Sequence, residues 1–190
     1  MREPRRDPRR VAVLISGRGS NMRALVERAS GYEVALIASN KPNAAGLDWA
    51  LARGLQTWSL ESKGLAKEEY DRQLTAALDE HDVGTIALAG FMRILSAWFV
   101  EEWRGKIVNI HPSLLPKYRG LDTHSRAIEA GDAVSGCSVH IVTEELDAGE
   151  VLGQAEVAIE PGDTPATLEQ RVLTAEHQLY PKVLSEFASR

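Results

Sequence analysis

The chain has 190 residues and a net charge of −5, with 44% apolar and 26% charged residues. This length and balance predict one globular domain with a substantial core. The acidic charge argues against nucleic acid as the main partner. The single cysteine, Cys137, excludes an internal disulfide and fits a reducing cytoplasm. No apolar run approaches the roughly 18 residues that a membrane-spanning helix needs.

The first ten residues, MREPRRDPRR, are rich in arginine and proline. The apolar run that follows them, residues 11–15, is too short for the core of a signal peptide. We therefore expect residues 1–10 to form a disordered, solvated tail and residues 11–190 to form a single domain. A basic arm that seeks phosphate is the alternative left open.

Strands and helices are predicted to alternate through the first part of the domain. Continuous apolar runs are typical of strands buried on both faces, and a period of 3.6 residues is typical of helices. Strands are predicted at 11–15, 32–39, 57–60, 83–89 and 106–109, and helices at 22–29, 44–53, 66–80 and 97–103. This alternation indicates a parallel, doubly wound sheet with helices on both faces.

The pattern changes after residue 111. A loop at 111–122 and a short helix at 123–130 precede two alternating runs, at 137–143 and 151–159, which predict antiparallel strands. The acidic loop 144–150 joins these strands. Asp163 or Thr164 is expected to cap a long final helix.

Three loops are predicted to meet where parallel strands end, which is where ligands bind in such sheets. They are the glycine loop at 16–21, the apolar loop at 90–95 and the turn at 109–113. The glycine loop lacks the dinucleotide fingerprint, because that pattern would need glycine at Met22. A strand, a glycine loop and a helix suit a monophosphate, with Ser20 and Asn21 as side-chain donors. The alternative is a glycine turn that only connects.

Asn109 and His111 lie two residues apart on a strand, so their side chains share a face. An amide donor beside an imidazole suits chemistry that moves a proton while charge develops on an oxygen. The alternative is a strand end whose polar residues satisfy a turn. No histidine pair has metal-ligand spacing, so no metal is predicted. No serine elbow or cysteine–histidine pair is present, and the attacking group is expected to come from a substrate.

Several stretches carry a resemblance to a known family: LISGRGSN, IASNKPNAAGL, LAGFMRIL, NIHPSLLPKYRGLDTH, SVHIVTEELDAG and AEH. The chain resembles the folate-dependent phosphoribosylglycinamide formyltransferases. The resemblance implies a Rossmann-like fold whose seven-stranded sheet is mostly parallel, with antiparallel strands in its C-terminal part. It also implies transfer of a formyl group from 10-formyltetrahydrofolate to the amine of glycinamide ribonucleotide, in purine biosynthesis.

The resemblance assigns roles to three groups of residues. The catalytic positions are Asn109, His111 and Asp147. The ribonucleotide-binding positions are Gly19, Ser20, Asn21, Leu173, Thr174, Ala175 and Glu176. The folate-binding positions are Lys67, Met92, Arg93, Ile94, Leu95, Asn109, Thr143, Glu144, Glu145, Leu146 and Asp147. It implies small-molecule partners, no metal, neither nucleic acid nor membrane, a cytoplasmic location, and a monomer or homodimer.

Other functions remain as alternatives. Methionyl-tRNA formyltransferase would need a C-terminal tRNA-binding domain, and formyltetrahydrofolate deformylase would need an N-terminal regulatory domain. Neither domain is expected here. A non-catalytic sensor of a phosphorylated ligand on the same fold would lack at least one of Asn109, His111 and Asp147, and all three are present.

Overall fold

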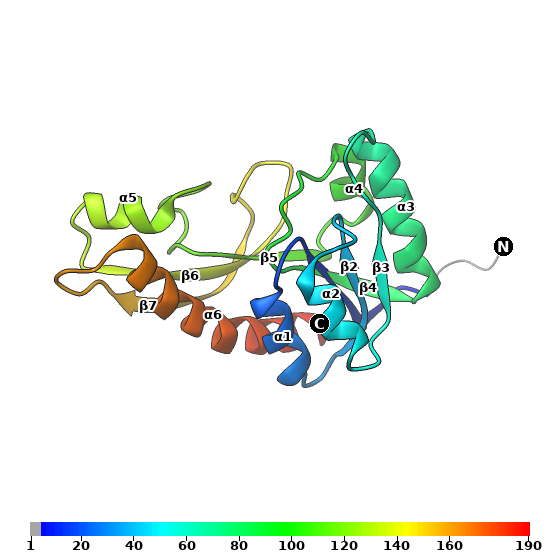
Figure 1. Ribbon diagram of the computed structural model, residues 1–190, viewed down its shortest axis with the longest axis horizontal. Coiled ribbons are helices and arrows are strands. Elements are labelled where there is room, and N and C mark those ends of the chain that lie inside the picture. The colour runs from blue at the N-terminus through cyan, green and yellow to red at the C-terminus, as the bar shows by residue number, and fades with distance from the viewer. Residues whose placement is uncertain (1–4) are drawn as a thin grey trace.

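The computed structural model describes residues 5–190, which form one seven-stranded sheet flanked by helices (Figure 1). The strands are β1 (Asp7–Ile15), β2 (Glu33–Ser39), β3 (Thr57–Ser59), β4 (Val83–Leu88), β5 (Ile107–His111), β6 (Val134–Ile141) and β7 (Val151–Ala158). The helices are α1 (Ser20–Glu27), α2 (Ala45–Leu51), α3 (Lys67–Glu80), α4 (Ala97–Glu102), α5 (Thr123–Glu129) and α6 (Pro165–Ala188). Although α6 has 24 residues, no helix within the described range is long and apolar enough to cross a membrane.

The sheet order is β3-β2-β1-β4-β5-β6-β7. Strands β1 to β5 run parallel to one another, whereas β6 pairs antiparallel with both β5 and β7. The predicted fold class, mostly parallel with antiparallel strands in the C-terminal part, is confirmed. Because β1, β2, β4 and β5 are parallel, the loops that follow them leave the same edge of the sheet.

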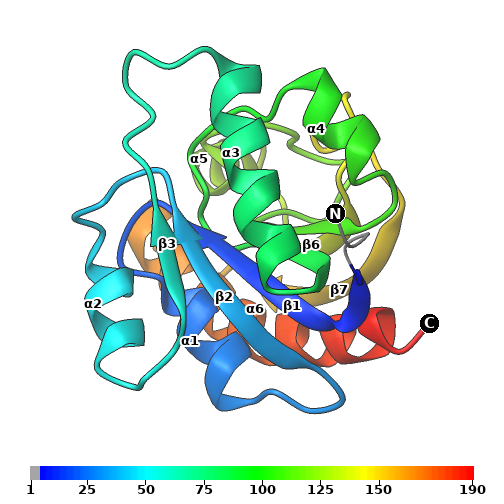
Figure 2. The same cartoon turned by 90° about the vertical axis from the view of Figure 1, so that its right-hand side faces the viewer.

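Strand β1 shows why its apolar run is continuous. Val11, Val13 and Ile15 pack into one core with α1, α2 and α6, whereas Ala12 and Leu14 pack into a second core with α3 and α4. Side chains alternate between the two faces of a strand, and here helices cover both faces. Figure 2 shows α3 and α4 on one side of the sheet, with α1 and α6 on the other.

The boundary expected at residue 10 is wrong, because β1 already begins at Asp7. The Asp7 amide donates to the Asp82 carbonyl at 3.0 Å. Arg6 donates from Nε to Asp79 at 2.9 Å, and its guanidinium lies 4.0 Å from the centre of the Trp103 ring. Arg6, one of the arginines that suggested a solvated tail, instead holds this segment against α3 and α4. Residues 1–4 of the expected tail lie outside the described residues.

The beginning of β1 packs closely on Gly84 of β4. A Cβ atom at position 84 would lie 2.3 Å from the Asp7 carbonyl carbon and 2.4 Å from its oxygen. Because backbone cannot yield as a flexible side chain can, we expect Gly84→Ala to lower the free energy of unfolding by about 1–3 kcal/mol. Urea denaturation measures this change.

Gly17→Ala is the matched control, since a Cβ atom there meets nothing within 4 Å. This control is expected to change the free energy of unfolding by less than about 1 kcal/mol. Equal losses in the two variants would contradict the close packing of β1 on Gly84.

Candidate active site

Asn109 lies near the end of β5, directly opposite His140 in the antiparallel ladder with β6. Its amide nitrogen is 3.3 Å from His140 Nε2, and His140 Nδ1 is 3.0 Å from the Ile141 carbonyl oxygen. A carbonyl oxygen only accepts, so Nδ1 carries a hydrogen. Without a proton Nε2 accepts from Asn109, whereas with a proton it faces Asp147 Oδ1, which is 3.6 Å away. His140 thereby orients the Asn109 amide and leaves its second N–H hydrogen for a ligand.

His111, the last residue of β5, is buried, and both of its ring nitrogens have partners. Nε2 donates to the Tyr118 carbonyl at 2.8 Å, and Nδ1 lies 3.5 Å from Asp147 Oδ2. A second proton, at Nδ1, would therefore form an ion pair with Asp147. The imidazole is held in one orientation and faces a carboxylate that can stabilise its charged form.

Asp147 reaches the site by an indirect path. Strand β6 ends at Ile141, opposite Val108, so it runs away from the end of β5. The following loop then turns back and brings Asp147 to His111. The return passes so close to β6 that a Cβ atom at Gly149 would lie 1.7 Å from the Ile141 carbonyl oxygen. Only glycine permits that approach.

The carboxyl of Asp147 is held in its charged form. Burial alone would raise its pKa, but the contact with His140, the Gly120 amide and the charge of His111 lower the pKa below its usual value. The Gly120 amide donates to Asp147 Oδ2 at 2.9 Å. Asp147 therefore presents a fixed negative charge to His111 at neutral pH.

The glycine loop precedes a helix whose first turn is open. Gly19 adopts a left-handed conformation, with φ of 71°, and precedes α1 without any side-chain cap. The first amides of a helix have no acceptor within the helix. Here no side chain caps them, and Gly19 and Ser20 are half-buried and exposed, so an anion can reach these amides. Ser16 ties this loop to the apolar loop, since its hydroxyl oxygen accepts from the Met92 amide at 2.7 Å.

A single cavity of about 730 Å³ joins these loops. Its lining comprises Asn21, Gly90, Phe91, Met92, Asn109, Ile110, His111, Pro112, Gly120, Leu121, Asp122, Thr123, His124, Ser125, Leu146, Asp147, Pro165, Glu169, Leu173 and Glu176. Three of its large apolar side chains, Met92, Leu121 and Leu146, are 71%, 75% and 69% exposed. Such a concentration of exposed apolar surface beside polar groups is typical of a ligand site.

At one end of the cavity, a buried acid faces the glycine loop. Glu176 of α6 accepts a hydrogen bond from the Asn21 amide nitrogen at 2.8 Å. Burial raises the pKa of Glu176 to about 7, against the lowering effect of Asn21 and with a further rise from Glu169. This carboxyl can therefore exchange a proton near neutral pH.

The structure brings together only part of the predicted site. Eight predicted residues line the cavity: Asn21, Met92, Asn109, His111, Leu146, Asp147, Leu173 and Glu176. Eleven others do not: Gly19, Ser20, Thr174, Ala175, Lys67, Arg93, Ile94, Leu95, Thr143, Glu144 and Glu145. Among these, the Arg93 guanidinium lies 4.4 Å from the centre of the Tyr70 ring, and Lys67 is exposed as the first residue of α3.

Sequence reasoning missed several polar residues of the site, among them two histidines and one acid. His140 contacts Asn109 and lies 3.6 Å from Asp147, while His124 and Glu169 line the cavity. Burial lowers the pKa of His124, and nearby His111 lowers it further against the opposing effect of Glu169. The ladder that pairs His140 with Asn109 is the signal that could have revealed His140, but the strand register is not readable from one sequence.

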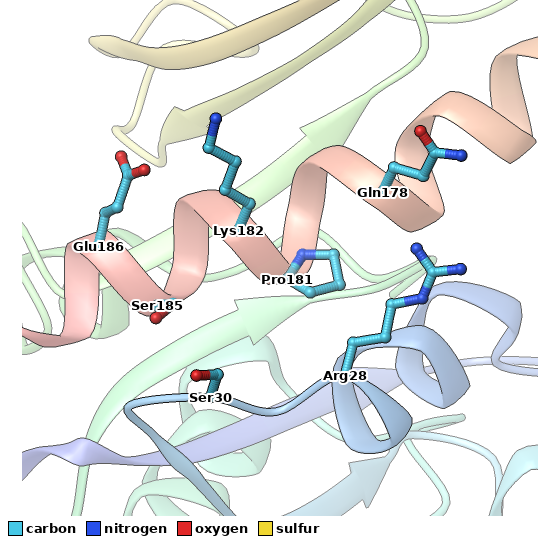
Figure 3. Close-up of a pocket in the computed structure, with 7 residues that line it drawn as sticks. All are labelled: Arg28, Ser30, Gln178, Pro181, Lys182, Ser185 and Glu186. Carbon is cyan, nitrogen blue, oxygen red and sulfur yellow. The ribbon is translucent and has the colours of Figure 1, made fainter.

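A second hollow, of about 380 Å³, lies between the end of α1 and the C-terminal half of α6. It is lined by Arg28, Ser30, Gln178, Pro181, Lys182, Ser185 and Glu186 (Figure 3). None of these was a predicted site residue, and Arg28 donates to the His177 carbonyl at 3.2 Å. Throughout the described part of the chain, no group of three or more histidine, cysteine or acidic side chains is arranged to hold a metal ion.

The sequence profile described as Formyl transferase matches residues 9–184. The chain belongs to this formyl transferase family. Phosphoribosylglycinamide formyltransferase of Escherichia coli (strain K12) is 45% identical over 183 residues, covering 94% of this chain and 86% of that protein. The crystal structure of phosphoribosylglycinamide formyltransferase from Brucella melitensis superposes with a TM-score of 0.90 at 46% identity, covering 96% of each chain.

A longer relative contains a segment similar to this chain. The trifunctional purine biosynthetic protein adenosine-3 of Homo sapiens is 45% identical over 185 residues, which cover 95% of this chain but 18% of that protein. The chain thus spans less than a fifth of the length of this multifunctional relative.

Proposed function

We propose that this chain transfers the formyl group of 10-formyltetrahydrofolate to the amine of 5'-phosphoribosylglycinamide. The products are formylglycinamide ribonucleotide and tetrahydrofolate, in de novo purine (IMP) biosynthesis. The observation that carries the proposal is one cavity containing Asn109, His111 and Asp147 beside an open helix N-terminus. Family membership and relatives named phosphoribosylglycinamide formyltransferase support the same reaction.

In the proposed mechanism, the substrate amine attacks the formyl carbon directly. A carbon–nitrogen bond forms, and the formyl oxygen becomes a tetrahedral oxyanion. The free N–H of Asn109 and a charged His111 stabilise this oxyanion, an effect of about 3–4 kcal/mol for a well-placed donor. As the bond to folate N10 breaks, His111 assists transfer of the amine proton to that nitrogen. Asp147 stabilises the imidazolium throughout.

The two substrates are proposed to approach from different ends of the cavity. Gly19, Ser20 and Asn21 receive the phosphate at the start of α1, and the segment 173–176 of α6 contacts the same ribonucleotide. The pteridine ring lies against the backbone of residues 92–95 and 143–147, beside the exposed Met92 and Leu146. Lys67 meets the folate glutamate tail as a point charge, without the forked geometry of arginine.

The proposed partners are these small molecules alone, with no metal, nucleic acid or membrane, and the chain acts as a monomer or homodimer. Its free cysteine, Cys137, is buried, and burial raises the pKa of this thiol to about 12. An inert, unpaired thiol supports a location in the reducing cytoplasm.

One assay tests the reaction. The protein is incubated with 10-formyltetrahydrofolate and 5'-phosphoribosylglycinamide, and tetrahydrofolate release is followed. We expect release that depends on both substrates, with the formyl group recovered on the ribonucleotide. Release at the same rate without the ribonucleotide would indicate a deformylase, and no release would indicate a binding protein. Either result overturns the proposal.

A further inference from the structure

The loop residues 118–121 contact both charged partners of the proposed reaction. The Tyr118 carbonyl accepts from His111 Nε2 at 2.8 Å. Two residues later, the Gly120 amide donates to Asp147 Oδ2 at 2.9 Å. The conformation of this short segment therefore sets how the imidazole and the carboxylate face one another.

That conformation is unfavourable for the isolated chain. Tyr118 and Asp122 have φ angles of 54° and 56°, in the left-handed region that residues with a Cβ atom avoid. Such residues keep this conformation only where their surroundings hold them in it. The segment therefore needs external support to keep the Tyr118 carbonyl and the Gly120 amide in place.

Arg126 of α5 supplies this support. Its Nη1 donates to the Arg119 carbonyl at 2.7 Å and to the Leu121 carbonyl at 3.1 Å. Its guanidinium carbon also lies 5.2 Å from the centre of the Tyr118 ring. These contacts hold the two carbonyls on either side of Gly120, the residue that contacts Asp147.

Two other interactions near the loop 118–121 contribute to its position to different extents. The Tyr118 hydroxyl donates to Asp132 Oδ2 at 2.6 Å, which fixes the outer end of that side chain. Arg119 pairs with Glu145 at 3.0 Å, but these side chains are 43% and 73% exposed. Solvent and salt screen such a pair strongly, so it contributes little to the position of the loop. Apart from His111 and Asp147 themselves, Arg126 is the side chain that hydrogen-bonds to the backbone of residues 118–121 within the described part of the chain.

We propose that Arg126 is a positioning residue, which holds the loop 118–121 so that His111 and Asp147 are aligned before substrates bind. This inference rests on the proposed function, because alignment matters only if these two groups act together. Arg126 touches neither of them and does not line the cavity. It acts through the backbone of Tyr118 and Gly120.

Arg126→Met tests this role, because methionine keeps an unbranched side chain and removes every donor. We expect kcat to fall about tenfold while KM for each substrate changes less than about twofold, since misplaced groups slow the chemical step. Arg126→Lys should recover part of the rate, because a single nitrogen makes both hydrogen bonds to the loop. Glu129→Gln, an exposed change on the same helix, should leave kcat unchanged.

A second readout is independent of activity. In the wild-type protein at a pH high enough to make the His111 ring neutral, its ¹⁵N shifts should report hydrogen on Nε2, where the Tyr118 carbonyl accepts it. In Arg126→Met, we expect a mixture of the two tautomers. Thermal unfolding of the methionine and lysine variants is measured beside the rates, so that a loss of kcat can be separated from a loss of stability.

The outcomes separate the two proposals. An unchanged tautomer in Arg126→Met overturns the positioning role, whatever the rates. Equal losses of kcat in the methionine and lysine variants, following the loss of thermal stability, also overturn it. Failure of the wild-type protein to transfer formyl groups overturns the proposed function, whereas the tautomer measurement still tests the position of the loop.

Discussion

Replacing Asp147 by asparagine is expected to lower kcat about a thousandfold while the chain remains folded. Asparagine has nearly the same shape, and its side-chain oxygen can still accept from the Gly120 amide, now 2.9 Å from Oδ2. The neutral amide cannot balance a charge on His111 Nδ1, which lies 3.5 Å away. The loss corresponds to about 4 kcal/mol of transition-state stabilisation. Steady-state formyl transfer with both substrates saturating measures it.

Glu150→Gln is the matched control, because it removes an exposed carboxylate from the same loop at a position without an assigned role. Its side chain does not line the cavity. We expect its kcat to stay within about twofold of the wild-type value. A loss below tenfold in Asp147→Asn, or an equal loss in both variants, would remove Asp147 from the catalytic group.

The parallel half of the sheet was predictable because its signals are local. The run from Val11 to Ile15 is apolar on both faces. The glycine loop follows this strand directly, and α1 follows the loop. Each of these features depends on residues within a few positions of one another. The edge at which the loops meet then follows from parallel strand direction alone.

Contacts between distant residues were not predictable in the same way. The composition of residues 1–10 suggested a solvated tail, but Arg6 pairs with Asp79, which lies 73 positions away. Likewise, the alternating pattern of β6 puts the side chains of Cys137 and His140 on different faces of the strand, but it does not identify the residue that His140 contacts. Only the register of β6 against β5 brings His140 to Asn109. Such pairings depend on tertiary structure, which the local pattern of apolar and polar residues does not reveal.

Asp147 shows most clearly which part of the site the sequence pattern cannot predict. Its role was implied by resemblance, and the direction of β6 alone would carry its loop away from His111. The loop returns because Gly149 can pass against the Ile141 carbonyl and because the Gly120 amide binds the carboxylate. Neither contact can be recognised from the residues next to it in the sequence. For Lys67 and Arg93, whose side chains lie outside the cavity, the folate-binding role remains a prediction.

The buried acid Glu176 should make stability depend on pH around neutrality. The pKa of this carboxyl is raised by burial to about 7 in the folded chain, from an ordinary value of 4.5. Between these two pH values the folded state holds a proton that the unfolded chain releases. The contribution of protonated Glu176 to the free energy of unfolding is therefore fully present below about pH 4.5 and is lost as the pH rises through about 7. The loss amounts to at most about 3 kcal/mol.

Glu176→Gln removes this titration while keeping an oxygen that can accept from Asn21 Nδ2, 2.8 Å from the present carboxyl. Relative to the wild-type protein, the variant should gain about 3 kcal/mol in free energy of unfolding between pH 4 and pH 8. Urea denaturation of both proteins at several pH values measures this difference. Glu186→Gln, an exposed change on α6, should give a difference that does not vary with pH. A constant difference for Glu176→Gln would mean that the carboxyl is already ionised when folded, and the Asn21–Glu176 pair would then be charged rather than neutral.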